Sequence, residues 1–292
     1  MAIAAIAIGL TEGSIYALVA VGFVILYRST KVFNFAQGSF MAIGAYLLLT
    51  FHDTWRLPWA IACVASAAVL AAIGLGIYVV IFRHLFGVDQ FVAVIATFGL
   101  SLLLLVGTQI IWGPNETTLS PPDFLRGSNY FSIAHSIVPA VDVYIVLTSW
   151  LLIAVIGIFL YRSRVGVHMR ATADSPLLAA NLGINIHWTS ALAWALTAVC
   201  AGVAGMSYGL TTAIDPTSFQ NIGLVAFAAI LIGGINSIGG ALLGGLTLGL
   251  VEGAATVTFG GQWSDVVAFS CLLGVLLIRP SGLFGRVSAL RL

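Results

Sequence analysis

The chain has 292 residues, of which 60% are hydrophobic and 7% are charged, and its formal net charge is +1. A soluble domain carries roughly 25% charged residues, so this composition excludes a water-soluble protein and indicates a chain that crosses a membrane several times. The near-neutral charge also excludes a nucleic-acid-binding protein, which needs a clustered basic face.

Nine apolar runs approach or exceed the length of about 20 residues that a helix needs to cross a bilayer. Two of them, 222–236 and 265–278, are short, and Gly233–Gly240 fits either a tight turn or a broken helix. We therefore expect one all-α membrane domain over residues 1–292, a polytopic bundle of about eight to ten helices. In chain order the runs are 3–27, 32–52, 59–82, 91–112, 143–161, 188–210, 222–236, 238–259 and 265–278.

The first run is preceded by no basic residue and is followed directly by Arg28. Basic residues gather in the cytosolic connections of membrane proteins. With the N-terminus outside, alternation of the runs places nine of the eleven Lys and Arg residues on the cytosolic side and leaves Arg56 and Arg126 opposite. The run also lacks the basic start and cleavage site of a signal peptide. We expect a retained helix, an external N-terminus and a cytosolic C-terminus.

The second run contains a polar-to-small stripe within VFNFAQGSFMAIGAY. Asn34, Gln37, Gly38 and Met41 follow helical spacing and would share one helix face. Inside a membrane, polar amides either bond to a neighbouring helix or face a water-lined path. Both interpretations are open, and the second makes these four residues candidates for a translocation pathway.

The eighth run combines an acid with a glycine repeat. Gly245, Gly249 and Gly253 recur every four residues, a spacing that lets helices approach closely in lipid. A charge at the centre of a bilayer costs ~2.5–3.5 kcal/mol, so intramembrane acids tend to be functional. We therefore include Glu252 among the pathway candidates. In an alternative class, an ion-coupled secondary transporter of a small solute, Glu12 and Glu252 would be the coupling acids.

The sequence shows no pattern of an enzyme. HExxH and GxSxG are absent, and the five histidines are scattered. The single lysine, Lys31, does not belong to a Walker A motif, so we expect no ATP site on this chain. Cys63, Cys200 and Cys271 have neither zinc-site nor disulfide-framework spacing. We predict a non-enzyme without a metal or cofactor of its own.

One long polar loop, RSRVGVHMRATADSPLLAANLGINIHW, separates the fifth and sixth runs. Ser175 is a good N-cap, Pro176 a good first helical residue and Gly183 a natural stop. These signals predict a helix of about seven residues, or ~10 Å. Leu178 and Leu182 would share one face of it. That face either lies on the bilayer surface or docks on a cytosolic partner.

Three blocks of the chain carry a family resemblance. The first is GSIYALVAVGFVILYRSTKVFNFAQGSFMAIGAY, residues 13–46. The second is MRATADSPLLAANLGIN, followed by ALAWALTAVCAGVAGM, and the third is DPTSFQNIGLVAFAAILIGGINSIGGALLGGLTLGLVEG, residues 215–253. In this order they resemble the LivH-type permease of the branched-chain amino-acid ABC transporter family.

The resemblance implies an ABC importer permease fold and a role in ATP-driven import of branched-chain amino acids across a bacterial cytoplasmic (inner) membrane. The expected partners are a LivM-like second permease, two cytosolic ATPase subunits that hold the ATP, an extracytoplasmic solute-binding protein and lipid. The external stretch 113–142 is the candidate surface for the binding protein. The sequence departs from the family pattern at Gln37 and Ser39, so urea and short-chain amides stay open as substrates.

The resemblance also assigns a role to the polar loop. Residues 162–187 would form a cytosolic coupling loop whose short helix enters a cleft in an ATPase subunit. The residues assigned to ATPase coupling are Ser175, Pro176, Leu178, Ala179, Leu182 and Gly183.

Overall fold

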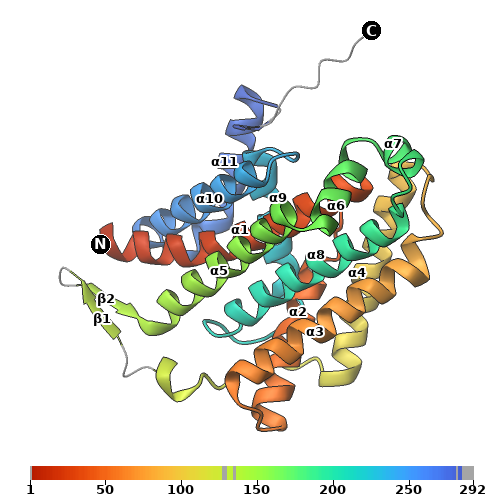
Figure 1. Cartoon of the computed structure of the whole chain (residues 1–292). Helices are drawn as coiled ribbons and strands as arrows, with labels where there is room; N and C mark the ends of the chain where they lie inside the picture. The colour runs from red at the N-terminus through yellow and green to blue at the C-terminus, as the bar shows by residue number, and fades with distance from the viewer. Residues whose placement is uncertain (1, 127–129, 134–135, 281, 285–292) are drawn as a thin grey trace.

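The computed structural model describes residues 2–126, 130–133, 136–280 and 282–284, which form a bundle of long helices (Figure 1). Backbone groups in lipid must find partners within the protein, and helices built from these Ala-, Leu-, Ile- and Val-rich runs provide them. The helices are α1 (Ala2–Thr30), α2 (Gln37–Leu49), α3 (Trp59–Ile77), α4 (Gln90–Trp112), α5 (Ala140–Arg162), α6 (Arg164–Asp174), α7 (Pro176–Asn181), α8 (Ile186–Tyr208), α9 (Ser218–Gly233), α10 (Ile238–Phe259) and α11 (Ser264–Ile278).

Short elements join these helices. Two π-helical turns, Thr50–Thr54 and Tyr78–Phe82, extend α2 and α3. Asp123–Leu125 and Gly261–Trp263 are 3₁₀ turns. On the α4–α5 connection, β1 (Tyr130–Ile133) pairs antiparallel with β2 (Ser136–Pro139), a hairpin that the sequence analysis did not predict.

All nine predicted runs form helices, which confirms the polytopic all-α bundle. Within the described residues, seven helices are long and apolar enough to cross a membrane. The two remaining runs form α2 and α9, which are 13 and 16 residues long. The segment Gly233–Gly240 is a tight turn, because α9 ends at Gly233 and Ser237 caps the start of α10.

The core lies around α1, α2 and α8. Helix α1 packs against α10, α8, α5 and α9, while α2 lies between α8, α9 and α4. The predicted glycine repeat explains the closest of these contacts: a Cβ on Gly249 would lie 2.2 Å from the backbone nitrogen of Gly13 on α1. Real Cβ atoms essentially never approach backbone so closely, so glycine is required where α10 crosses α1.

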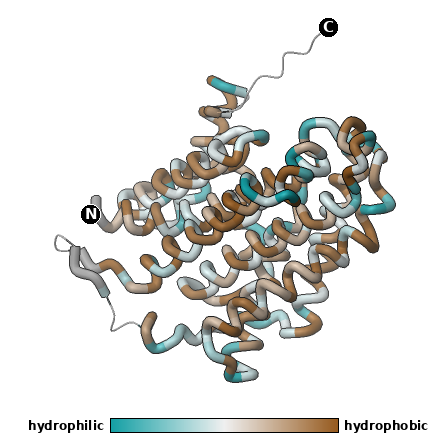
Figure 2. The backbone as a smooth tube through the Cα atoms, in the orientation of Figure 1, coloured by the Kyte–Doolittle hydropathy of each residue, from teal (hydrophilic) through white to brown (hydrophobic). Residues whose placement is uncertain are grey.

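The outer helices expose apolar side chains. Val80, Ile110 and Leu277 are 71, 79 and 85% exposed in the isolated chain. Figure 2 shows hydrophobic residues along the long helices and hydrophilic residues near the ends of the bundle, including the α6–α7 end. This distribution suits contact with lipid around the sides and with water at the two ends.

Candidate functional site

The polar loop between α5 and α8 is folded into two helices, α6 and α7, at one end of the bundle (Figure 1). The prediction of a single short helix in this loop was therefore incomplete, because α6 was missed. The signal was present: Gly166, Met169 and Ala173 have i, i+3, i+7 spacing and are all buried. Interspersed arginines and a histidine gave the segment the composition of a loop.

Helix α6 is fixed to the membrane bundle at both ends. Its N-cap, Ser163, accepts a hydrogen bond from the backbone N–H of Gly166 at 2.9 Å. A Cβ on Gly166 would lie 2.3 Å from the carbonyl oxygen of Leu160, so the turn from α5 into α6 leaves no room for a side chain. Further along, the hydroxyl of Thr189 on α8 donates to that of Thr172 at 3.2 Å. A force on α6 therefore reaches both α5 and α8.

Helix α7 begins and ends as the sequence predicted. The Ser175 hydroxyl accepts from the backbone N–H of Leu178 at 3.4 Å, and Pro176 is the first helical residue. Gly183 adopts a φ of +79°, and the N–H groups of Gly183 and Ile184 bond to carbonyl oxygens within α7. This is a Schellman stop, in which a left-handed glycine satisfies the last carbonyls.

The outer face of α7 is an exposed apolar surface. Leu177, Leu178 and Leu182 are 74, 62 and 79% exposed, whereas Ala179 is 1% exposed and seats the helix on the bundle. We call these three leucines the α7 patch. An exposed cluster of large apolar side chains is typical of a docking or membrane-contacting surface. The coupling residues predicted from the sequence thus lie on one short, well-defined element.

The predicted pathway residues at the start of the second run are close together but buried. Asn34 precedes α2 by one turn, so the prediction that it lies on the helix was wrong. Its side-chain amide nitrogen donates to the side-chain oxygen Oε1 of Gln37 at 3.2 Å, and its side-chain oxygen Oδ1 accepts from the backbone N–H of Ala36 at 3.1 Å. Gln37 donates in turn to the carbonyl oxygen of Val19 at 3.4 Å. These bonds hold the non-helical segment that leads into α2.

Gly38 and Met41 contact neighbouring helices. A Cβ on Gly38 would lie 2.5 Å from the carbonyl oxygen of Phe219 on α9. The Met41 backbone meets α8, where a Cβ on Gly205 would lie 1.9 Å from the Met41 carbonyl oxygen. The described geometry shows close helix contacts at Gly38 and Met41, and the pathway role of these residues stays a prediction.

Glu252 lies apart from this group. It is 1% exposed on α10, and the acids and phenol around it include Glu12 and Tyr16 of α1. The Tyr16 hydroxyl lies near Glu252 but does not meet the geometry of a hydrogen bond to it. Neither carboxylate oxygen of Glu252 has a hydrogen-bond partner among the described residues. Gln37 instead bonds to Val19 of α1, which lies three residues beyond Tyr16 and seven residues, about two turns, beyond Glu12.

A polar cluster that the sequence analysis missed joins α2, α4 and α9. The Ser39 hydroxyl donates to the carbonyl oxygen of Ser101 at 3.0 Å, and the two hydroxyls are 3.2 Å apart. The Gln220 amide donates to these hydroxyls at 3.5 and 3.4 Å. In the sequence the three residues are isolated polar positions far apart, so only the fold reveals that they form one site.

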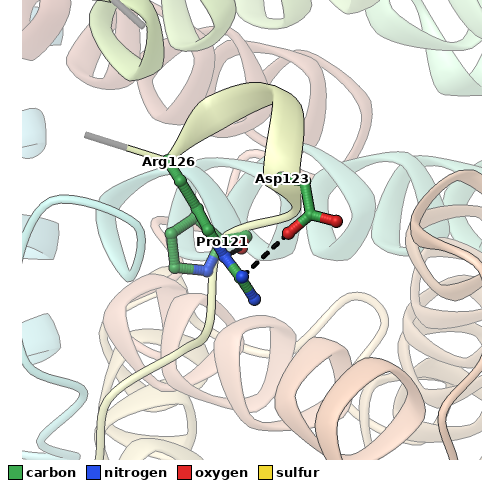
Figure 3. Close-up of polar contacts among 3 residues, drawn as sticks. All are labelled: Pro121, Asp123 and Arg126. Carbon is green, nitrogen blue, oxygen red and sulfur yellow. Dashed lines mark hydrogen bonds and ion pairs between the residues drawn. The ribbon is translucent and has the colours of Figure 1, made fainter. Parts of the chain in front are cut away.

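The connection after α4, which the sequence predicts to be external, is held by local polar contacts. Figure 3 shows the ion pair of Arg126 with Asp123, 2.8 Å long, and the bond from Arg126 Nε to the carbonyl oxygen of Pro121 at 3.3 Å. Both charged side chains are mostly exposed, so the pair contributes at most about 1 kcal/mol. Its effect is to shape the surface of the predicted binding-protein contact.

Comparisons with known proteins find relatives along nearly the whole chain. The profile of the family described as "Branched-chain amino acid transport system / permease component" matches residues 5–276. The chain is 36% identical to the high-affinity branched-chain amino acid transport system permease protein BraD of Pseudomonas aeruginosa, over 95% of this chain and 94% of the relative.

Two further relatives extend this similarity. The high-affinity branched-chain amino acid transport system permease protein LivH of Escherichia coli is 33% identical over 95% of this chain and 94% of its own. A probable branched-chain amino acid transport permease protein LivH of Methanocaldococcus jannaschii is 29% identical over 92% of this chain and 88% of its own.

Proposed function

Because the chain belongs to the family of branched-chain amino acid transport system permease components, we propose that it is a membrane-spanning subunit of an ATP-driven importer for these amino acids in a bacterial cytoplasmic membrane. Family membership favours the importer over the alternative of an ion-coupled secondary transporter. Urea and short-chain amides are the competing substrates.

The α7 patch is the observation that supports this role most directly. An importer permease without its own nucleotide site needs a surface through which ATP-driven closure of other subunits reaches its helices. Helix α7 presents apolar side chains outward, and α6 connects it to α5 and α8. We propose that the patch docks in an ATPase subunit and that residues 162–187 act as the coupling loop.

The remaining partners follow from this proposal. Two ATPase subunits would bind and hydrolyse ATP, and a second, LivM-like permease would complete the membrane part. A solute-binding protein would deliver substrate to the external face, where the 113–142 stretch is the candidate contact. With the N-terminus outside, the α7 end is cytosolic and the hairpin end is external.

Uptake measurements test the proposal. Cells that lack their own branched-chain amino acid transport would carry this chain with its ATPase, second permease and binding protein. Radiolabelled leucine should accumulate in a vanadate-sensitive, ionophore-resistant manner, and excess unlabelled urea or acetamide should not compete. Accumulation abolished by an ionophore but insensitive to vanadate would instead identify an ion-coupled transporter.

A further inference from the structure

Helix α9 is too short to cross the membrane. Its 16 residues span ~24 Å, whereas the hydrocarbon core is ~30 Å thick. Its third residue, Gln220, bonds to Ser101, the central residue of α4, so α9 starts near the middle of the membrane. The preceding segment 209–217 is not helical. Ile214 in this segment pairs with Thr117 beyond the end of α4, so the chain returns from the hairpin end of the bundle to the start of α9 without a helix. Non-helical backbone that reaches membrane depth is tolerated only where protein buries it or where it lines a water-filled cavity.

A cavity of about 130 Å³ lies at this point. This is roughly ten times the space that one water molecule requires. Ser101 and Gln220 provide its polar surface, and Phe35 and Phe98 form an aromatic wall with ring centroids 4.3 Å apart. Leu102 and Leu224 also line it and are 61 and 46% exposed. The cavity therefore opens sideways from the bundle, between α4 and α9.

The polar groups of this cavity are incompletely satisfied. The Gln220 amide nitrogen makes only long bonds to the two serine hydroxyls, and its side-chain oxygen accepts no bond from the described residues. Lipid cannot supply the missing hydrogen-bond partners of Gln220, so water, substrate or protein must occupy the open side of the cavity. A glutamine amide offers both donors and an acceptor.

We propose that this cavity is a substrate subsite at the centre of the membrane, in which Gln220 binds the charged backbone groups of an amino acid and the Phe35–Phe98 wall contacts its apolar side chain. This inference rests on the proposed function, and the second permease would cover the open side. The Gln220 amide can donate to the substrate carboxylate and accept from its ammonium group. It carries no fixed charge, so the substrate can leave again, as passage requires.

Replacing the amide tests the role of Gln220. Gln220→Leu keeps a side chain of similar size without hydrogen-bonding groups. We expect the maximal rate of leucine uptake to fall about tenfold or more, at normal amounts of assembled transporter, because bonds to charged groups contribute about 1.5–3 kcal/mol. Gln109→Leu is the matched control, since Gln109 is a half-buried glutamine of α4 that does not line this cavity.

Cysteine accessibility tests the cavity without removing a polar group. In a transporter whose three native cysteines are replaced by alanine, Leu224→Cys should react with a small charged methanethiosulfonate, which modifies thiolates in water. Leucine at millimolar concentration should slow the reaction. Leu151→Cys on α5, where Leu151 is 65% exposed, is the lipid-facing control and should stay unmodified.

The two proposals fail differently. If the wild-type transporter does not accumulate leucine, the proposed function is wrong. If it does, but Gln220→Leu transports normally and Leu224→Cys is as unreactive as Leu151→Cys, the subsite is wrong while the importer stands. Modification of Leu224→Cys without protection by leucine would also overturn the subsite, because it would show water there but no substrate.

Discussion

Single glycines set the distances between the central helices. At Gly205 the backbone of α8 lies directly on the Met41 carbonyl of α2, where a Cβ would be 1.9 Å from the oxygen. Helices in a membrane are held by close packing and interhelical bonds rather than by the hydrophobic effect. Loss of such a contact therefore removes a large part of the interaction between two helices. Glycines on the lipid-facing surface have no such role.

Gly205→Ala should destabilise the transporter, and Gly99→Ala should not. A methyl group at Gly205 forces α8 away from α2, and overpacking of this kind costs about 1–3 kcal/mol. Gly99 lies on the exposed side of α4 with nothing within 4 Å of a Cβ, so alanine there should be neutral or slightly stabilising. Thermal unfolding of the detergent-purified transporter measures both, and equal melting temperatures for the two variants would contradict the packing argument.

At the scale of elements, the sequence predicts what composition and local signals control. The nine membrane runs were found because each is a long apolar segment, and α7 was found because Ser175 and Gly183 mark its ends. Helix α6 was missed because its buried face consists of only a few residues between charged ones. The Ser39–Ser101–Gln220 cluster could not be predicted, since its members come together only when α2, α4 and α9 pack.

Helix α7 offers the sharpest test of an element. Replacing both Leu178 and Leu182 by Asp would place two unpaired charges in the proposed ATPase contact. Burying unpaired charge costs several kcal/mol, and each 1.4 kcal/mol weakens binding tenfold. The double variant should insert into the membrane normally. When the transporter is pulled down, the amount of ATPase recovered with it should fall at least about tenfold, and leucine uptake should fall in parallel.

A conservative change controls for this effect. Leu178→Met with Leu182→Met keeps the α7 patch apolar and should retain both ATPase and uptake. If α7 instead lies on the bilayer surface, the aspartates would loosen the helix from lipid while ATPase recovery stays at the wild-type level. That outcome would contradict ATPase docking by α7.

For the molecule as a whole, the two ends of the bundle carry different features. The α6–α7 end contains Arg164 and Arg170, with Arg170 placed 4.9 Å from the Tyr161 ring. The opposite end contains the hairpin and the Thr117–Ile214 backbone pairing, which ties the α4–α5 connection to the segment that precedes α9. Substrate delivery and ATP-driven force would thus act on opposite ends of the same helices, with the Gln220 cavity between them.

This arrangement predicts the orientation of the chain. Glu116 and Asp174 are both exposed, the first on the hairpin side and the second beside α7. In a cysteine-free background, a membrane-impermeant maleimide added to intact cells should label Glu116→Cys, because that residue is expected outside. Asp174→Cys should be labelled only after the cells are permeabilised, because the positive-inside distribution of nine basic residues predicts that it lies in the cytosol. The opposite labelling pattern would reverse the topology and put the α7 patch out of reach of any cytosolic ATPase.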